Sequence, residues 1–305
     1  MIHPWYTPPK IVNNIFLENK KALYTVVMPV FNHEKIIETT LKSLFLNSKN
    51  LFSLIIIIDA SEDDSLNKII KFIENSNCIK LCSITYVINE TPIFETASDN
   101  QGFRLAETEY ILELQADIII NDFGFDDRMI FALENYKLAS ISGRHVHYFS
   151  VLDRLSWLKY PIFTLSAVFF SKPILFGKYG KKIFKRGLYD KNIIVVIGET
   201  VARGPWMLRK KDLIDLNYLD EDNFFLGNDD HDFNRRMYSI KKMTCGYVPM
   251  DIYSPESSGS TRQERYGINK EIYNWLSENK KGSSGFVKFI RKYRPYKHMK
   301  TIMKK

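Results

Sequence analysis

The chain has 305 residues, of which 45% are hydrophobic and 26% are charged, and its formal net charge is +8 at pH 7. These are ordinary values for a globular protein with a large core, and the positive charge favours anionic partners such as nucleotides or phospholipid surfaces. Three cysteines without paired spacing argue against a disulfide framework, the start resembles no signal peptide, and the apolar stretch 161–176 is too broken to span a bilayer. We therefore expect a soluble cytoplasmic protein.

The amino-terminal part alternates between predicted strands and predicted helices. Residues 1–21 contain prolines and no clear period, so we interpret them as an irregular lead-in. The hydrophobic pattern then predicts strands at 24–29, 54–58, 84–88 and 110–117, and helices from 35 to 45, through 66–73 and at 97–106. This order is the signature of a parallel sheet with right-handed crossovers.

Two of the predicted strands end in a carboxylate. Asp59 ends the apolar run 54–58, and Asp117 ends the run that starts at Tyr110. Because ligands bind outside the carboxyl ends of parallel strands, both side chains are candidates for one ligand site. The alternative for Asp117 is a side chain that only caps the following turn.

A second acidic group begins a predicted helix further along the chain. After a helix at 125–138, an aromatic and basic stretch at 150–192 and a strand at 193–197, three aspartates occur within four residues, at positions 229, 230 and 232. Helix capping needs only one of them. Because crowded carboxylates raise one another's pKa, this group is a candidate general base. We expect the stretch 150–192 to shape an acceptor pocket.

The carboxyl-terminal part has a different composition. A polar loop at 254–265 precedes a predicted short helix at 267–278, and residues 286–305 are basic with interspersed aromatics. This end is interpreted either as a solvated tail or as a segment that docks on an anionic membrane surface. The abundance of Ile, Lys and Asn indicates an AT-rich genome, such as that of a bacterium or a large DNA virus.

Together these segments resemble a family 2 glycosyltransferase with the GT-A fold. The similarity covers about residues 23–262 and rests on segments 26–32, 57–63, 99–117 and 229–236. It implies an α/β, Rossmann-like, mostly parallel sheet flanked by helices in a single catalytic domain. By this resemblance residues 1–22 are a lead-in, 23–124 bind the nucleotide-sugar, 125–262 bind the acceptor, and 263–305 form a helical, basic extension.

The resemblance also implies roles for individual residues. The family's Asp-x-Asp metal motif corresponds to Gln115-Ala116-Asp117, so Asp117 is the residue expected to bind Mn²⁺ or Mg²⁺. Gln115 can accept a hydrogen bond from a ribose hydroxyl but adds no charge toward the cation. Asp59 would accept a hydrogen bond from the nucleobase. The full set implied for nucleotide-sugar binding is Pro29, Val30, Phe31, Asp59, Asn100, Gln115, Ala116 and Asp117.

The acceptor side carries the implied chemistry. Asp230 would be the base, with Asp229 raising its basicity, as in the family's acidic motif with a trailing arginine. Trp206 is either a face for the sugar or a core residue. The residues implied for the acceptor and the diphosphate are Arg203, Gly204, Trp206, Arg236 and Arg262.

The resemblance implies an inverting hexosyl- or N-acetylhexosaminyltransferase. It would move a sugar from a nucleoside diphosphate sugar, with a UDP-sugar favoured, to a hydroxyl of a glycan, lipid or protein. The alternative is a nucleotide-sugar-binding module with an impaired metal motif. A nucleotidyltransferase is disfavoured because the loop 29–34 has no Gly or Arg to hold a triphosphate, and no nucleic-acid partner is expected. Peripheral membrane contact is expected only through the tail.

Overall fold

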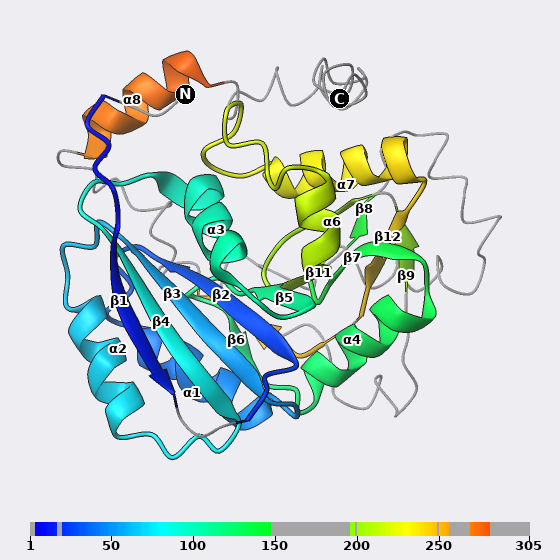
Figure 1. The fold of residues 1–305 in the computed structure, drawn as a ribbon, viewed down its shortest axis with the longest axis horizontal. Coiled ribbons are helices and arrows are strands. Elements are labelled where there is room, and N and C mark those ends of the chain that lie inside the picture. The colour runs from blue at the N-terminus through cyan, green and yellow to red at the C-terminus, as the bar shows by residue number, and fades with distance from the viewer. Residues whose placement is uncertain are drawn as a thin grey trace.

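The computed structural model describes residues 4–16, 20–144, 146–147, 196–198, 200–248, 250–255 and 269–280. Within these residues a nine-stranded mixed sheet has the strand order β1-β4-β3-β2-β5-β11-β7-β12-β9, and helices cover both of its faces (Figure 1). Its strands are β1 (Lys10–Phe16), β2 (Tyr24–Val30), β3 (Phe52–Asp59), β4 (Leu81–Asn89), β5 (Tyr110–Glu113), β7 (Leu138–Ser142), β9 (Val196–Gly198), β11 (Trp206–Arg209) and β12 (Thr244–Tyr247).

Two short strand pairs lie outside this sheet. They are formed by β6 (Ile119–Ile120) with β13 (Ile252–Tyr253), and by β8 (Val146–His147) with β10 (Thr200–Val201). The described helices are α1 (Ile37–Asn47), α2 (Ser65–Glu74), α3 (Phe94–Leu105), α4 (Phe125–Asn135), α6 (Lys210–Asp215), α7 (Asp229–Lys241) and α8 (Asn269–Asn279).

The four strands β4, β3, β2 and β5 form the parallel part of the sheet. Strand β3 contains four consecutive isoleucines, and all of its residues except the half-buried Ser53 are buried, as expected for a strand covered on both faces. Right-handed crossovers place α1 and α2 on one face and α3 on the other (Figure 1). Helix α3 approaches closely because Gly102 has no side chain: a Cβ there would lie 2.3 Å from a methyl group of Val27.

The predicted helices and the three strands from 24 to 88 are confirmed, with modest shifts of their ends. Helix α3 begins three residues before the predicted position 97. Helix α8 confirms the helix predicted at 267–278. None of the three cysteines, all of which lie in the described residues, forms a disulfide. The predictions for residues 150–192, for Arg262 and for the basic tail 286–305 concern residues outside the described ranges.

Two secondary-structure predictions are wrong. The strand predicted at 110–117 ends at Glu113, and the motif at 115–117 instead lies in a turn closed by the bond from Ile118 N–H to Gln115 O, 3.0 Å long. Residues 1–21 are not wholly irregular, because β1 joins the sheet antiparallel to β4. A shift of register between Val12 and Ile15 interrupts the alternation of inward and outward residues in β1. The sequence pattern therefore does not predict this strand.

The second half of the sheet is mixed. Strand β11 runs antiparallel between β5 and β7, and β12 runs parallel to β7. This arrangement places the segment before β11 next to the carboxyl end of β5. Among the described helices, none is long and apolar enough to cross a membrane.

Candidate active site

The candidate site lies at the carboxyl edge of the parallel strands. The chain runs from β2 to β3 and β4 in one direction and then returns through α3 to β5 on the other side of β2. The strand order therefore reverses between β2 and β5, and ligands of open α/β sheets bind at such a point. Segment 29–31 at the end of β2 and segment 115–117 after β5 flank this position.

Asp59 ends β3 and fixes the start of α3. Its carboxylate accepts hydrogen bonds from the N–H groups of Ile93 and Phe94, at 2.9 and 2.8 Å, and from the Asn89 side chain at 3.2 Å. Burial raises the pKa of Asp59 to about 6, although these three donors favour its charged form. Asp59 thus lies at the predicted edge, and the contacts that the structure gives it are internal.

The two polar residues of the motif at 115–117 have different surroundings. The Gln115 amide donates to Glu95 Oε1 at 2.8 Å, and its oxygen lies against Gly204, where a Cβ would stand 2.7 Å away. This amide is therefore held between α3 and the segment before β11. Asp117 instead accepts a hydrogen bond from Ser254 Oγ at 2.8 Å.

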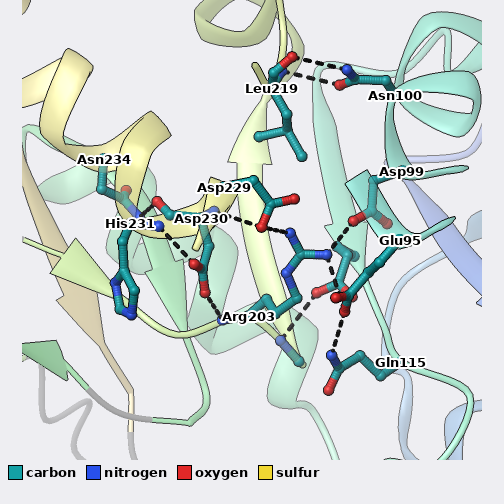
Figure 2. A network of polar contacts seen from close by, with 12 residues as sticks. Glu95, Asp99, Asn100, Gln115, Arg203, Leu219, Asp229, Asp230, His231 and Asn234 are labelled. Atoms are coloured by element: carbon teal, nitrogen blue, oxygen red, sulfur yellow. Dashed lines mark hydrogen bonds and ion pairs between the residues drawn. The ribbon is translucent and has the colours of Figure 1, made fainter. Parts of the chain in front are cut away.

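Arg203 is the centre of a buried polar network (Figure 2). Its guanidinium lies between carboxylates of α3 and α7: it contacts Glu95 Oε1 at 3.1 Å and Asp99 Oδ2 at 2.5 Å, and it pairs with Asp229 on the other side. The next residue's N–H, that of Gly204, donates to a carboxylate of β5, Glu113, at 3.0 Å. One segment thus ties together α3, β5 and α7.

The carboxylates in this network outnumber its positive charges. Burial raises the pKa of Glu113 to about 8 and raises the pKa of Asp99 well above its ordinary value, although the nearby Arg203 charge opposes both shifts. Each of these side chains, like that of Asp229, also has one buried oxygen without a hydrogen-bond partner among the described residues. The raised pKa of Glu113 places a proton in the network at neutral pH, which relieves the repulsion between its carboxylates.

Asp230 follows Asp229 at the start of α7 and has different partners. Its Oδ2 accepts a hydrogen bond from the backbone N–H of Arg203 at 2.9 Å, and its Oδ1 accepts one from the backbone N–H of His231 at 2.7 Å. Burial opposes ionisation, but the charges of His231 and Arg203 and these two donors together lower the pKa of Asp230. The expectation that neighbouring carboxylates raise this pKa is wrong, because Arg203 neutralises Asp229 and donates to Asp230.

Three of the expected site residues have internal roles in the structure. Asn100 exchanges hydrogen bonds with the backbone of Leu219, at 2.9 and 3.0 Å. Arg236 donates to Asp232 and to two backbone carbonyls, and only 3% of its side chain is exposed. Trp206 is fully buried and packs edge-on against a phenylalanine of α7, so the core interpretation of this residue applies.

The remaining expected residues line the edge of the sheet. Val30 and Ala116 are buried, so any contact with a ligand would use their backbone. Pro29 and Phe31 are half-buried and keep accessible side-chain surface. Gly204 adopts φ +73°, a left-handed conformation that favours glycine.

Sequence reasoning missed three members of the network. Glu95 and Asp99 are four residues apart and so share one face of α3, a spacing that marks a polar helix face. Glu113 is a single charge within the buried strand β5, and such a charge requires a partner. These signals were present in the sequence, but the shared partner Arg203 is about 90 residues or more away along the chain.

The site was also tested as a metal site. No group of three or more His, Cys, Asp or Glu side chains within the described ranges is arranged to hold a metal ion. Asp117 alone offers one carboxylate, with Ser254 beside it. Mg²⁺ is commonly held by one or two carboxylates together with substrate phosphates. The residues therefore fit a cation shared with a bound diphosphate, and they do not form a complete protein cage.

Comparison with protein families gives one match. Residues 25–193, more than half of the chain, match the family model described as glycosyl transferase family 2. No curated protein sequence matches the chain.

Three solved structures illustrate what the chain is similar to. One is GalNAc-T7 with UDP, GalNAc and Mn²⁺, with a TM-score of 0.52 and 10% identity over 78% of this chain and 45% of that chain. A second is the mannosyltransferase PcManGT of Pyrobaculum calidifontis in complex with GDP-Man and Mn²⁺, with a TM-score of 0.50 and 14% identity over 94% and 69% of the two chains. TarS 1–349 of S. aureus with UDP matches at a TM-score of 0.48 and 17% identity over 75% of this chain and 59% of its own. The present chain thus spans less than two thirds of TarS 1–349 and of GalNAc-T7.

Proposed function

The chain belongs to glycosyl transferase family 2, and from this premise we propose that it transfers a sugar from a nucleoside diphosphate sugar to a hydroxyl group, with inversion at the anomeric carbon. Residues 23–124 would bind the donor and residues 125–262 the acceptor. The donor is proposed to be a UDP-sugar carrying a hexose or an N-acetylhexosamine. The acceptor is proposed to be a hydroxyl of a glycan, a lipid or a protein.

One observation carries the proposal: a chain of direct contacts links the donor motif to the acidic motif. Gln115 contacts Glu95, Glu95 contacts Arg203, and the Arg203 N–H donates to Asp230. A sugar in transfer needs its diphosphate on one side and the attacking hydroxyl on the other. Two motifs held at a fixed separation by directly contacting side chains would supply that geometry.

Asp230 is proposed as the base. The acceptor oxygen forms a bond to the anomeric carbon while the bond from that carbon to the diphosphate oxygen breaks, and the acceptor proton moves to the Asp230 carboxylate. The lowered pKa of Asp230 keeps it ionised and ready to accept this proton. Because such a carboxylate is a weak base, transfer of the proton would occur late, when bond formation has already acidified the hydroxyl.

The departing diphosphate gains negative charge, which the site must stabilise. A Mn²⁺ or Mg²⁺ ion held by Asp117 and the donor phosphates would supply this charge. GalNAc-T7 and PcManGT were each solved with Mn²⁺, which supports a divalent cation here. The guanidinium groups of Arg203 and Arg236 are engaged by carboxylates and backbone carbonyls of the protein, so their proposed role is to hold the site together rather than to contact the diphosphate.

A nucleotide-sugar-binding module without catalysis is the second candidate. It is favoured by one feature, the neutral Gln115 in place of an acidic residue, with its amide engaged by Glu95 and Gly204. The paired acids at 229 and 230 favour the enzyme instead. Either protein would be cytoplasmic, with peripheral membrane contact proposed only through the basic tail.

Thermal-shift measurements with UDP-, GDP- and dTDP-sugars test the proposed donor, each with Mn²⁺, with Mg²⁺ and with a chelator. A ligand that binds only the native state raises the melting temperature by mass action. We expect a rise with one class of sugar nucleotide that is largest with a divalent cation. No shift with any of them contradicts donor binding. Release of nucleoside diphosphate from the donor then separates the enzyme from the binding module.

A further inference from the structure

Glu95 lies between the two halves of the site. It is in the first turn of α3. The start of this helix is fixed by hydrogen bonds that the N–H groups of residues 93 and 94 donate to Asp59. A second bond, from the Thr96 N–H to Phe225 O at 3.3 Å, ties the same turn to the loop before α7. Hydrogen bonds of the residues before and after Glu95 therefore hold its backbone in place.

Only one oxygen of this carboxylate is used internally. Glu95 Oε1 accepts the Gln115 amide at 2.8 Å and contacts Arg203 at 3.1 Å. No hydrogen bond to Oε2 is present among the described residues. The Glu95 side chain is 20% exposed, whereas those of Asp99 and Asp229 in the same network are fully buried. Glu95 is thus the most exposed acid of these three, and its Oε2 has no hydrogen bond within the described part of the chain.

If the proposed function holds, Glu95 lies beside the place expected for the transferred sugar. Its anomeric carbon is bonded to the diphosphate, on the side of Gln115 and Asp117, and is attacked from the side of Asp230. Glu95 contacts the first side directly and the second through Arg203, whose N–H binds Asp230. A carboxylate is an acceptor only, and its hydrogen bonds with hydroxyl groups are strong.

We propose that Glu95 is a specificity-determining residue whose Oε2 accepts a hydrogen bond from a hydroxyl of the donor sugar, while Oε1 holds Gln115 and Arg203. This inference rests on the proposed function and extends it to the recognition of the sugar. The ligand class that Glu95 selects is a sugar with a free hydroxyl at the contacted position.

The test uses calorimetry to measure the affinity for UDP and for the UDP-sugar in wild type and in Glu95→Gln. If the protein binds GDP- or dTDP-sugars instead, the corresponding pair of ligands is used. A hydrogen bond to a charged group contributes about 1.5–3 kcal/mol, so we expect a loss of about 10- to 100-fold in affinity for the UDP-sugar and less than about twofold for UDP. A deoxysugar donor that lacks the contacted hydroxyl would bind both proteins equally. Glu90→Gln, an exposed change nearby, is the matched control.

A swap variant, Glu95→Gln with Gln115→Glu, tests whether recognition of the sugar depends on the position of the carboxylate or only on the net charge of the network. It keeps an amide–carboxylate pair and the net charge of the network but moves the carboxylate to the turn after β5. We expect the swap not to restore the difference in affinity between the UDP-sugar and UDP, whatever its effect on UDP itself. Full recovery in the swap, or equal losses for UDP and the UDP-sugar in Glu95→Gln, overturns the inference. A wild type that binds no sugar nucleotide contradicts the proposed function instead, so the two failures are distinguishable.

Discussion

The backbone N–H of Arg203 donates to Asp230 Oδ2 over 2.9 Å, while the guanidinium of the same residue pairs with the neighbouring Asp229. One residue therefore neutralises a buried group of acids and also orients the proposed base. Its position before β11 lets it reach α3 and α7 at once. The organisation of the site depends on this residue more than on any single carboxylate.

Replacing Arg203 by Met should strongly destabilise the fold. The substitution leaves the buried Asp99 and Asp229, and the partly buried Glu95, without their ion-pair partner, and loss of one partner of a buried ion pair costs about 3–5 kcal/mol. Chemical denaturation measures the loss. Lys49→Met removes a surface pair with Asp127, in which both side chains are about half exposed, and should cost far less because solvent screens that pair. Similar losses in the two variants would show that Arg203 is not the centre of the network.

Glu113→Gln should change how stability depends on pH. Burial raises the pKa of Glu113 to about 8 from the ordinary 4.5, so between these values the native state holds a proton that the unfolded chain releases. Native stability contributed by this group therefore falls as pH rises through the window. The glutamine variant lacks this titration and should gain on wild type by a few kcal/mol between about pH 5 and pH 9. Unfolding curves with the same pH slope for both proteins would contradict the raised pKa.

Gly204→Ala and Gly227→Ala form a matched pair. Both glycines have positive φ, +73° and +69°, so each substitution has a backbone cost of about 1–2 kcal/mol. At Gly204 the new Cβ would also stand 2.7 Å from Gln115 Oε1, whereas at Gly227 nothing lies within 4 Å. Gly204→Ala should therefore cost about 1–3 kcal/mol more. Adding Gln115→Ala should recover part of this excess, and equal costs for the two glycines would refute close packing against the amide.

Asp117→Ala should weaken donor binding in Mn²⁺ by about 10- to 100-fold, because it removes the one carboxylate that fits a shared cation. In the presence of a chelator the variant and wild type should bind alike. Ser254→Ala removes a hydrogen bond to Asp117 but keeps the carboxylate, and it should have a smaller effect. Isothermal calorimetry gives the constants. A dissociation constant unchanged by Asp117→Ala in Mn²⁺ would exclude a cation at this residue.

The parallel core of the fold could be predicted from the sequence because each strand is a short apolar run with its own boundary. Strand β3 is the clearest case, since its pattern is local. The end of β5 could not be predicted, because Leu114 continues the apolar run and donates its N–H to Val27 O, and only then does the chain turn. Strand β1 was missed because a bulge breaks its period.

The candidate site was predictable only in part, for a related reason. The sequence points to three of the acids because of their places: Asp59 ends β3, Asp117 follows the apolar run of β5, and Asp230 is in the first turn of α7. The partners that define their roles are distant along the chain, as Ser254 is from Asp117. Arg236 resembles a phosphate-binding residue in sequence, but its donors are used by backbone carbonyls that no pattern reveals.

The release of nucleoside diphosphate from a donor sugar, measured for wild type and Asp230→Asn, tests the central claim most directly. We expect wild type to release it with a suitable hydroxyl acceptor, or slowly with water. Asp230→Asn should lose about 10²–10⁴-fold in rate while its affinity for the donor stays within about threefold. Asp127→Asn, a change at a surface ion pair, should retain full activity. Release by Asp230→Asn at the wild-type rate would contradict the account.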